Sequence, residues 1–241
     1  MDIVYLVKND EENDSEELRY SLRSLQNIPH DKVVIVGEKP DWATNVTYIP
    51  VEQNKTKPEN VAMNLSAAIT SELVSDDFLL MNDDFFIMKS IPEMPSLNFG
   101  KITDVVADYL ARYPEGSEYI DGMKTLHDIL VDKGFSEPMS YELHSPLVLN
   151  KQNVASLHEK IEGRLYQFRS AYGNYFPNNS VTVPDVKIFL DATHNAPEYN
   201  ENPSAYLERQ TFLSATGGAF KRGPAGDFVR SSFPDKSPYE L

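Results

Sequence analysis

The pattern of apolar and polar positions predicts alternating strands and helices over the first third of the chain. Residues 2–7 form a short apolar, β-branched run that is typical of a buried strand, and the polar residues 8–14 predict a loop after it. A helix is expected next, with the Ser15 hydroxyl as its N-terminal cap. The apolar face of this helix is expected to carry three leucines at helical spacing: Leu18, Leu22 and Leu25.

Three further strands are expected at residues 32–37, 46–51 and 77–81, with a helix over 58–74 between the last two. The proline inside 46–51 places that strand at a sheet edge or ends it early, because proline cannot donate a ladder hydrogen bond. Strands that alternate with helices and are rich in β-branched residues predict an α/β fold: a mixed, mainly parallel sheet flanked by helices. Ligands of such sheets bind at the carboxyl ends of the strands.

The rest of the chain has a weaker pattern. Prolines punctuate residues 91–140, where the clearest expected helix spans 101–112, and another helix is predicted over 150–169. Residues from about 215 onward are rich in glycine, proline and aromatic side chains, which predicts an ordered, loop-rich cap. No change in composition marks a linker, so residues 1–241 are predicted to form a single domain.

Composition narrows the chemistry open to the protein. The 241 residues contain no cysteine, which excludes disulfides, thiol nucleophiles and thiolate metal sites. A metal ion would have to be held by oxygen ligands or by the five histidines, which favours Mg²⁺ or Mn²⁺. The 22 basic and 37 acidic residues give a formal net charge of −15. Such a field disfavours wrapping around duplex nucleic acid but allows a local basic groove.

Two features of the apolar pattern bear on location. No run approaches the roughly 18 apolar residues of a membrane-spanning helix, so no membrane span is expected. The chain opens on a strand-like run with no basic segment before it, which argues against a secretory signal peptide. The expectation is a cytoplasmic protein, either bacterial or encoded by a virus or phage and acting in the host cytoplasm.

The most informative segment is Asn82-Asp83-Asp84, which lies between the apolar runs 77–81 and 85–87. Carboxylates between two buried runs are costly unless they bind a cation or find hydrogen-bond donors. At the end of a strand they can hold a divalent metal ion that neutralises a diphosphate. The alternative is an ordinary turn, because asparagine and aspartate are common turn formers. The apolar runs on both sides favour the metal site.

The chain also resembles a known family over nearly its full length. The matching pieces occur in the family's order and comprise residues 17–25, 33–36, 40–42, 82–86, 144–146, 168–170 and 233–240. They are similar to motifs of the Stealth family, which comprises sugar-phosphate transferases built on an A-type glycosyltransferase core. Two segments depart from the family pattern: residues 6–9 replace its Trp-Val-Asn-Gly, and residues 58–60 stand where it carries Phe-Asn-Ser.

The resemblance implies roles for individual residues. Asp83 and Asp84 would hold Mg²⁺ or Mn²⁺ on the diphosphate of a nucleotide-sugar donor, with a UDP-sugar as the first candidate. His144 would act as base or nucleophile toward an acceptor hydroxyl, because imidazole titrates near neutral pH. Arg169 would bind phosphate oxygens through its planar guanidinium group.

Each of these side chains also has an ordinary structural explanation. A lone histidine is commonly structural, and Arg169 can equally be a solvated cation at the end of a helix. Arg19 is a further candidate for donor binding, although a surface ion pair with a nearby glutamate is the commoner arrangement. Asn60 and Asn64 lie one helical turn apart and could read a nucleobase or a sugar, or serve as capping and surface residues.

The resemblance also divides the predicted domain by task. Residues 1–90 would form the nucleotide-sugar-binding half, and residues 91–241 the acceptor and catalytic half with its C-terminal cap. The glycine-rich residues 217–226, which include Lys221 and Arg222, could form a flexible basic lid over phosphates or a plain loop.

Three functions agree with these observations. The first is transfer of a sugar 1-phosphate to an acceptor hydroxyl, for which a glycan is favoured. The second is plain glycosyl transfer on the same core, with a glycan, a protein or a hydroxylated nucleobase as acceptor. The net charge of −15 counts against a nucleic-acid acceptor without ruling it out. The third is a non-catalytic module that binds a sugar or a nucleotide.

Overall fold

The computed structural model describes residues 1–8, 15–160 and 167–241. They form two compact units. The first unit therefore takes residues from both of the predicted halves, 1–90 and 91–241. Among the described residues, no helix is long and apolar enough to cross a membrane. The first unit comprises Met1–Met94, His144–Val148 and Val186–Leu241, and the second comprises Pro95–Leu143 and Leu149–Asp185.

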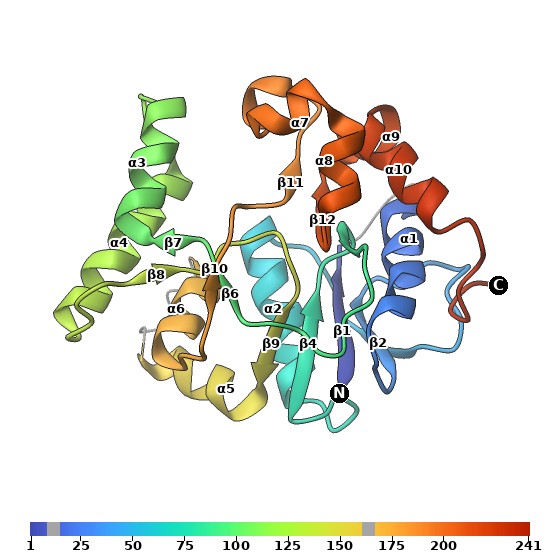
Figure 1. The fold of residues 1–241 in the computed structure, drawn as a ribbon. Coiled ribbons are helices and arrows are strands. Elements are labelled where there is room, and N and C mark those ends of the chain that lie inside the picture. Colours follow the sequence, from blue (N-terminus) through green and yellow to red (C-terminus); the bar gives the residue numbers. More distant parts are fainter. Residues whose placement is uncertain (9–14, 161–166) are drawn as a thin grey trace. The chain divides into compact units, whose positions relative to one another are not determined.

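The first unit is built on four strands of a five-stranded sheet, in the order β3-β2-β1-β4, and its residues Leu147 and Val148 begin the fifth strand, β9, beside β4 (Figure 1). β1 pairs in parallel with β2 and β4, and β2 pairs in parallel with β3, so the predicted mainly parallel α/β sheet is confirmed. The proline-containing strand β3 lies at an edge, as expected. The strands are β1 (Asp2–Val7), β2 (Val33–Gly37), β3 (Thr47–Pro50), β4 (Asp77–Met81) and β9 (Leu147–Asn150).

The direction in which strands are added to the sheet reverses between β1 and β4. From β1 the chain runs through α1 (Glu16–Ser24) and the short helix η1 (Leu25–Asn27) to β2 on one side. It returns from β3 through α2 (Lys57–Thr70) to β4 on the other side. Open α/β sheets bind their ligands at such a reversal, beyond the carboxyl ends of the two strands. Lys8 and Asn82 are the first residues past these two ends.

The central strands form the core because they are apolar on both faces. Tyr5, Ile35 and Leu79, one from each of the three central strands, have no exposed surface. The predicted apolar face of α1 is also confirmed, since its leucines Leu18 and Leu22 are almost fully buried, as is Leu25 at the start of η1. Burial on both faces is what the near-continuous apolar runs of parallel strands predict.

The two helices of this sheet begin differently from one another. Ser15 precedes α1, but its backbone is left-handed with φ of 40° and its side chain makes no capping hydrogen bond. The expected serine cap is therefore wrong, because the left-handed geometry is not the extended conformation that capping residues adopt. α2 instead begins with a capping box, in which the Thr56 and Glu59 side chains each bind the other's backbone N–H.

A second, three-stranded sheet follows the acidic segment. It contains β11 (Lys187–Ile188), β12 (Phe212–Ala215) and β5 (Phe85–Ile87) in this order, with β11 parallel and β5 antiparallel to β12. Phe86 of β5 is fully buried and stacks on Phe220, with their ring centroids 5.5 Å apart. β5 thus links the acidic segment to the core of the C-terminal helices.

The residues after position 185 in this unit are largely helical, which corrects the expected loop-rich cap. Gly217 and Gly218 begin a helix, so they form neither a plain loop nor a flexible lid. Gly226 allows a close approach, because a Cβ atom there would lie 1.7 Å from the Phe220 carbonyl oxygen. The elements are η2 (Ala192–His194), α7 (Pro197–Glu201), α8 (Pro203–Arg209), α9 (Gly217–Arg222) and α10 (Pro224–Ser232).

The second unit contains helices and short strand pairs. β6 pairs in parallel with β10, and β7 pairs antiparallel with β8. The helix expected over residues 101–112 is confirmed as α3. The elements are β6 (Leu97–Asn98), β7 (Gly100–Lys101), α3 (Ile102–Arg112), α4 (Glu118–Asp132), β8 (Met139–Ser140), α5 (Lys151–Lys160), α6 (Phe168–Tyr175) and β10 (Val181–Thr182).

The helix expected over residues 150–169 differs from the observed structure. α5 covers its first part, residues 161–166 lie outside the described part, and Arg169 belongs to α6, a separate helix. Gln167 precedes α6 with φ of 60°, a left-handed backbone that does not continue a helix. Arg169 therefore lies in the first turn of a helix rather than in the last.

The segment after α10 is bound to α1 through a buried carboxylate. The fully buried Glu240 side chain accepts hydrogen bonds from Arg23 Nε and Nη2, both at 2.7 Å, and from Arg19 Nη1 at 3.2 Å. It also accepts one from the Ser237 backbone N–H at 2.9 Å. Burial raises the pKa of Glu240, but these hydrogen bonds outweigh burial and lower the pKa from its usual 4.5 to about 2.

Glu240→Gln is expected to lower the free energy of unfolding by about 3 kcal/mol, because it removes the buried carboxylate that binds both Arg23 and Arg19. The folded pKa lies below the unfolded one. The contribution of Glu240 is therefore fully present above about pH 4.5 and is lost as the pH falls toward 2. Urea denaturation of both proteins across this range measures the effect.

The gap in stability between wild type and Glu240→Gln should shrink as the pH falls, and a gap that stays constant would contradict the assignment. Glu137→Gln is the matched control, since Glu137 forms an exposed ion pair with Lys101. Its loss should change the free energy of unfolding by less than about 1 kcal/mol.

Candidate functional site

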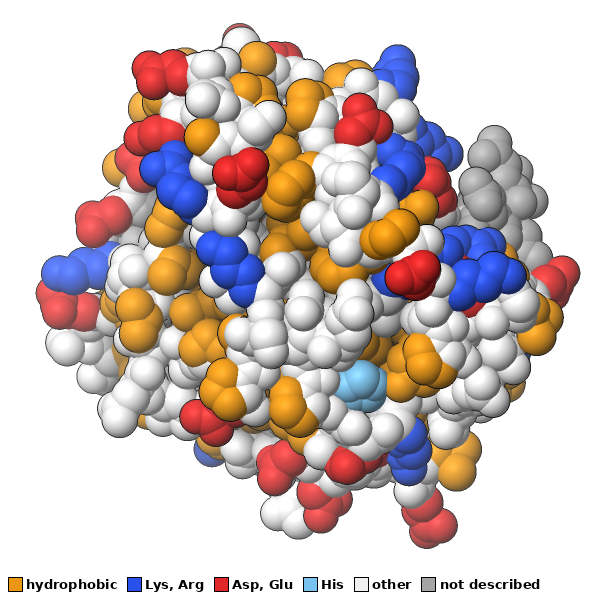
Figure 2. All heavy atoms as spheres, turned by 45° about the vertical axis from the view of Figure 1, so that its right-hand side comes forward, with side chains coloured by type: hydrophobic (Ala, Val, Ile, Leu, Met, Phe, Trp, Pro, Cys, Tyr) orange, Lys and Arg blue, Asp and Glu red, His pale blue; other side chains and the backbone are white. Residues whose placement is uncertain are grey.

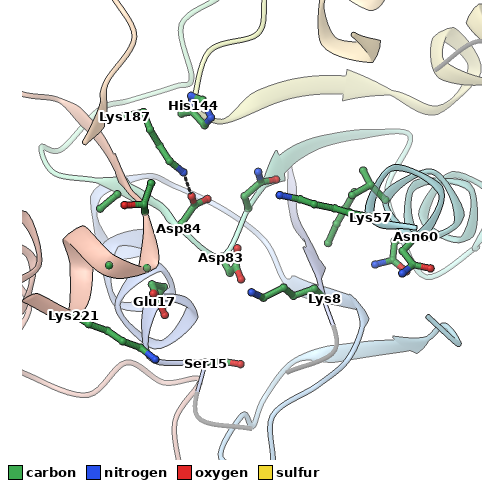
Figure 3. A pocket seen from close by; sticks show the side chains of 18 of the residues that line it. Lys8, Ser15, Glu17, Lys57, Asn60, Asp83, Asp84, His144, Lys187 and Lys221 are labelled. Carbon is green, nitrogen blue, oxygen red and sulfur yellow. Dashed lines mark hydrogen bonds and ion pairs between the residues drawn. The ribbon is translucent and has the colours of Figure 1, made fainter. Parts of the chain in front are cut away.

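A cavity of about 1140 Å³ lies within the first unit, at the carboxyl ends of β1 and β4 (Figure 3). It forms at the reversal of strand order, where the fold predicts a ligand site. Amide side chains and His144 line it together with charged groups. The charged residues of its lining are five bases and three acids: Lys8, Lys57, Lys187, Lys221, Arg222, Glu17, Asp83 and Asp84.

The cavity is locally positive in a protein of net charge −15. Figure 2 shows basic and acidic side chains interspersed over one face of the molecule, so the acidic excess leaves room for local groups of cations. Among the described residues, four of the five cationic side chains have no hydrogen-bond or ion-pair partner: Lys8, Lys57, Lys221 and Arg222. Cations that line a cavity without partners favour an anionic ligand.

Asp83 is the member of the adjacent pair Asp83 and Asp84 that lacks a donor among the described residues. Its half-buried carboxylate accepts no hydrogen bond from any described residue. Burial raises the pKa of the Asp83 carboxyl to about 6, and the nearby Asp84 and Glu17 carboxylates add to the rise, while Lys8 and Lys187 oppose it. A desolvated carboxylate without a donor is unfavourable, so this position favours a bound cation.

Asp84 has the partners that Asp83 lacks. Its Oδ2 accepts a hydrogen bond from Lys187 Nζ and another from Ser214 Oγ at 3.3 Å. The strand register creates this arrangement, because Lys187 pairs with Ser214 across β11 and β12, and Ser214 pairs with Phe85 across β12 and β5. Phe85, the residue after Asp84, thus lies directly across the sheet from Ser214, which in turn pairs with Lys187.

Two serines of α1 fix the chain just after the acidic pair. Ser21 Oγ donates to the Phe85 carbonyl oxygen and accepts a hydrogen bond from the Tyr5 hydroxyl at 2.9 Å. Ser24 Oγ accepts from the Ile87 backbone N–H at 3.1 Å. Burial raises the pKa of Tyr5, so this hydroxyl keeps the proton that it donates. Helix α1 thereby holds both ends of β5.

Amide side chains form the wall of the cavity beside β1. Asn64 is buried, its Nδ2 lies 3.5 Å from the Val7 carbonyl oxygen, and its Oδ1 has no hydrogen-bond partner. Gln53 Nε2 donates to the same carbonyl oxygen at 2.7 Å. Gly37 makes this packing possible, because its φ is 107° and a Cβ atom there would lie 2.2 Å from the Val7 oxygen. Asn60 binds the Lys55 backbone through both of its amide atoms, at 3.1 and 3.0 Å.

The structure brings together five of the seven residues that the sequence singled out: Asp83, Asp84, His144, Asn60 and Asn64 all line the cavity. The His144 ring makes an edge contact with Phe85, at 6.4 Å between centroids. The other two, Arg19 and Arg169, are not in the lining of this cavity.

Arg19 and Arg169 have other partners. Arg19 binds Glu240 and lies 4.1 Å from the centre of the Trp42 ring. Glu17 lines the cavity, and a residue two positions later on a helix points to the opposite side. Arg169 belongs to the second unit, where its Nε donates to the Tyr141 carbonyl oxygen at 3.2 Å.

Three of the five cations of the cavity lining carried no role in the sequence interpretation: Lys8, Lys57 and Lys187. Lys8 had a usable signal, since it is the first residue after the first parallel strand. Lys57 begins α2, where a lysine is unremarkable. Lys187 had none, because it lies 103 positions from Asp84 on a strand of two residues.

The donor set fits a divalent cation that a ligand completes. Among the described residues, no three His, Cys, Asp or Glu side chains are grouped so that they could hold a metal ion. Asp83 and Asp84 nevertheless offer carboxylate oxygens beside Asn82, and Mg²⁺ is commonly held by one or two carboxylates together with substrate phosphates and water. The Asp83 carboxylate, which has no donor, is the observation that supports this fit.

No protein-family model matches the chain, and neither does any curated protein sequence. Among solved structures, it is similar to the galactosyltransferase LgtC in complex with donor and acceptor sugar analogues, at 12% identity over 99% of this chain and 98% of that chain, with a TM-score of 0.48. It is also similar to the glycosyltransferase GlyE of Streptococcus pneumoniae TIGR4, at 8% identity over 98% of this chain and 60% of that chain, with a TM-score of 0.42. The similarity to mouse xyloside xylosyltransferase 1 has 9% identity over 90% of this chain and 98% of that chain, with a TM-score of 0.41.

Asp83→Asn is expected to stabilise the protein without ligands at pH 8, by about 2 kcal/mol after allowance for solvent screening. The folded pKa of about 6 lies above the usual 3.8, so the stability of the wild type falls as the pH rises from about 4 to about 6. Urea denaturation at pH 4 and pH 8 should show this fall in the wild type and not in the variant.

Asp84→Asn is the matched control, since it leaves Lys187 beside a neutral amide. It should destabilise the protein at pH 8, by contrast with its neighbour. If both variants lose stability alike, Asp83 has a donor and is not the uncompensated carboxylate of the site.

Proposed function

We propose that the protein transfers a sugar or a sugar 1-phosphate from a nucleotide-sugar donor to an acceptor hydroxyl, in the presence of Mg²⁺ or Mn²⁺. A UDP-sugar is the first candidate for the donor, and a glycan for the acceptor. The observation that carries this proposal is one cavity in which, among the described residues, four cations have no ion-pair partner and the Asp83 carboxylate has no donor. The site of action is proposed to be the cytoplasm.

The mixture of charges in the cavity supports a phosphate ligand that binds with a metal ion. Cations alone would suit many anions, but Asp83 and Asp84 repel an anion unless a divalent cation lies between them and it. A diphosphate meets both conditions, because its oxygens bind lysine and complete the coordination of the metal. When bound, the metal ion would neutralise charge on the leaving nucleotide.

The amide wall supports a nucleotide at the β1 side of the cavity. Asn64 lines this wall, and its buried Oδ1 is an acceptor without a partner among the described residues. Leu6 and the exposed Val61 supply apolar surface beside it. In the view of Figure 3, Lys8 and Lys57 flank this side, within reach of phosphates attached to the nucleoside.

His144 is proposed as the base that takes the proton of the acceptor hydroxyl. In sugar-phosphate transfer, the hydroxyl oxygen would attack the β-phosphorus, and the bond to the α-phosphate oxygen would break to release a nucleoside monophosphate. In glycosyl transfer, the oxygen would attack the anomeric carbon and release a nucleoside diphosphate. Both reactions use the same cavity groups.

The resemblance to the Stealth family favours sugar-phosphate transfer. The hydrogen bonds between the segments that resemble the family's motifs support the same proposal. Arg19 and Arg23 of the segment 17–25 bind Glu240 of the closing segment, and Ser21 of the same helix binds Phe85 of the acidic segment. Motifs that are far apart in sequence thus support one another around one site. Plain glycosyl transfer remains the second candidate.

A thermal-shift screen of UDP-, GDP- and CMP-sugars, each with and without Mn²⁺, tests the donor. The right donor should raise the melting temperature together with Mn²⁺ more than either does alone, and saturation at 100 times Kd corresponds to about 2.7 kcal/mol. Phosphorus NMR of the best donor with a glycan acceptor then identifies the product. A nucleoside monophosphate means sugar-phosphate transfer, and a diphosphate means glycosyl transfer. No stabilisation by any donor would overturn the proposal.

His144→Gln should retain metal-dependent donor binding and lower kcat by at least about 100-fold, because general bases contribute on that scale. Thermal shift measures the binding and phosphorus NMR the turnover. His127→Gln is the control, since His127 lies on α4 beside Asp128 and away from the cavity lining. Turnover that survives in His144→Gln would remove this residue from the mechanism.

A further inference from the structure

The ion pair between Lys187 and Asp84 is unlike a surface ion pair. The Lys187 side chain is only 11% exposed and that of Asp84 only 20%. Ser214 Oγ donates a further hydrogen bond to the Asp84 oxygen that binds Lys187. The backbone of three paired strands fixes both partners, as the register of β11, β12 and β5 requires. The pairing of the strands therefore holds Lys187 next to the Asp84 carboxylate.

A divalent cation that binds this carboxylate has to compete with Lys187. Oδ2 of Asp84 already accepts two hydrogen bonds, and Mg²⁺ binds carboxylate oxygens at about 2.0–2.1 Å. An ammonium group at the same carboxylate would lie within a few ångström of the metal ion, where like charges repel strongly in a desolvated site. One cation must leave before the other can bind well.

Lys187 needs a new anion if it leaves Asp84. A buried ammonium group without a partner is costly, and the neighbouring cavity residues Lys221 and Arg222 repel it. Glu17 and Asp83 are the other acids of the lining, and Asp83 is the first candidate for the metal itself. In Figure 3, Lys187 lies beside the open centre of the cavity, where the phosphate of a donor would accept it.

We propose that Lys187 competes with the divalent cation for Asp84, so that metal ion and donor bind cooperatively. The donor phosphate draws Lys187 away from Asp84, and the freed carboxylate then binds the metal. By linkage, the metal must strengthen donor binding by the same factor. The inference rests on the proposed function and assigns Lys187 as the residue that couples the two ligands.

The test measures Mn²⁺ affinity by titration with electron paramagnetic resonance, with and without UDP, for wild type and Lys187→Met. Methionine keeps an unbranched side chain of similar length but removes the charge. In the wild type, UDP should tighten Mn²⁺ binding about tenfold or more, within the usual range of coupling between sites. Lys187→Met should bind Mn²⁺ about tenfold more tightly than wild type without UDP and should lose most of the UDP effect.

Lys221→Met is the matched control, because Lys221 lines the same cavity without an ion pair. It removes the same charge, so any general electrostatic effect on Mn²⁺ appears in it too. It should weaken UDP binding yet keep the tightening of Mn²⁺ by UDP. A thermal melt establishes that each variant folds, and Lys187→Gln, which can still donate to Asp84, replaces Lys187→Met if the latter does not.

Equal Mn²⁺ affinity in wild type and Lys187→Met without UDP would overturn the competition. If neither protein binds Mn²⁺ while UDP binds both, Lys187 itself serves as the cation of the site, and the coupling is likewise refuted. Failure of UDP to bind any variant would instead count against the proposed function. The comparison of Mn²⁺ affinities without UDP would still decide whether Lys187 contests Asp84.

Discussion

Two adjacent carboxylates between two buried strands are the constraint on which this structure depends. Asp83 and Asp84 follow β4 and precede β5, whose residues Phe85, Phe86 and Ile87 are almost fully buried. Both acids are partly shielded from water at such a place, so a cation or a donor would stabilise each of them. The fold supplies Lys187 and Ser214 to one acid and leaves the other for a ligand.

The neighbouring elements follow from this constraint. β5 leaves the line of the parallel sheet and pairs with β12, which brings β11 and its lysine to the acidic pair. Ser21 and Ser24 of α1 bind the backbone of β5, and α1 is in turn held by Glu240 through Arg19 and Arg23. The closing segment of the chain thus supports the site without lining it, because it fixes the helix that fixes β5.

Sequence predicted the parts of this structure that depend on local pattern. Apolar runs in the sequence predict the strands β1, β2 and β4. Asp83 and Asp84 can be recognised as candidates because carboxylates are unexpected between two apolar runs. The pairing of strands that are far apart in the chain could not be predicted from the sequence. A strand of two residues has no periodicity, so no sequence pattern indicated a role for Lys187. Arg19 was a candidate for donor binding, with an ion pair to a nearby glutamate as the commoner alternative, and the sequence did not reveal its partner Glu240, which lies 221 positions away. The expected helix over residues 150–169 is interrupted at Gln167 by a left-handed backbone angle φ, which glutamine, a good helix former, does not predict.

The asymmetry between the two acids explains why a cavity can be both stable and receptive to charged ligands. If both carboxylates had lysine partners, no anionic group would be left to attract a metal ion. If neither had one, repulsion between them would oppose the turn that the strands impose. With one acid neutralised from within the fold and the other left desolvated, Asp83 is the proposed position of a cation. The lysines of the lining that have no ion-pair partner among the described residues are the proposed phosphate ligands. A metal ion and a diphosphate together satisfy the whole set of charges, which neither does alone.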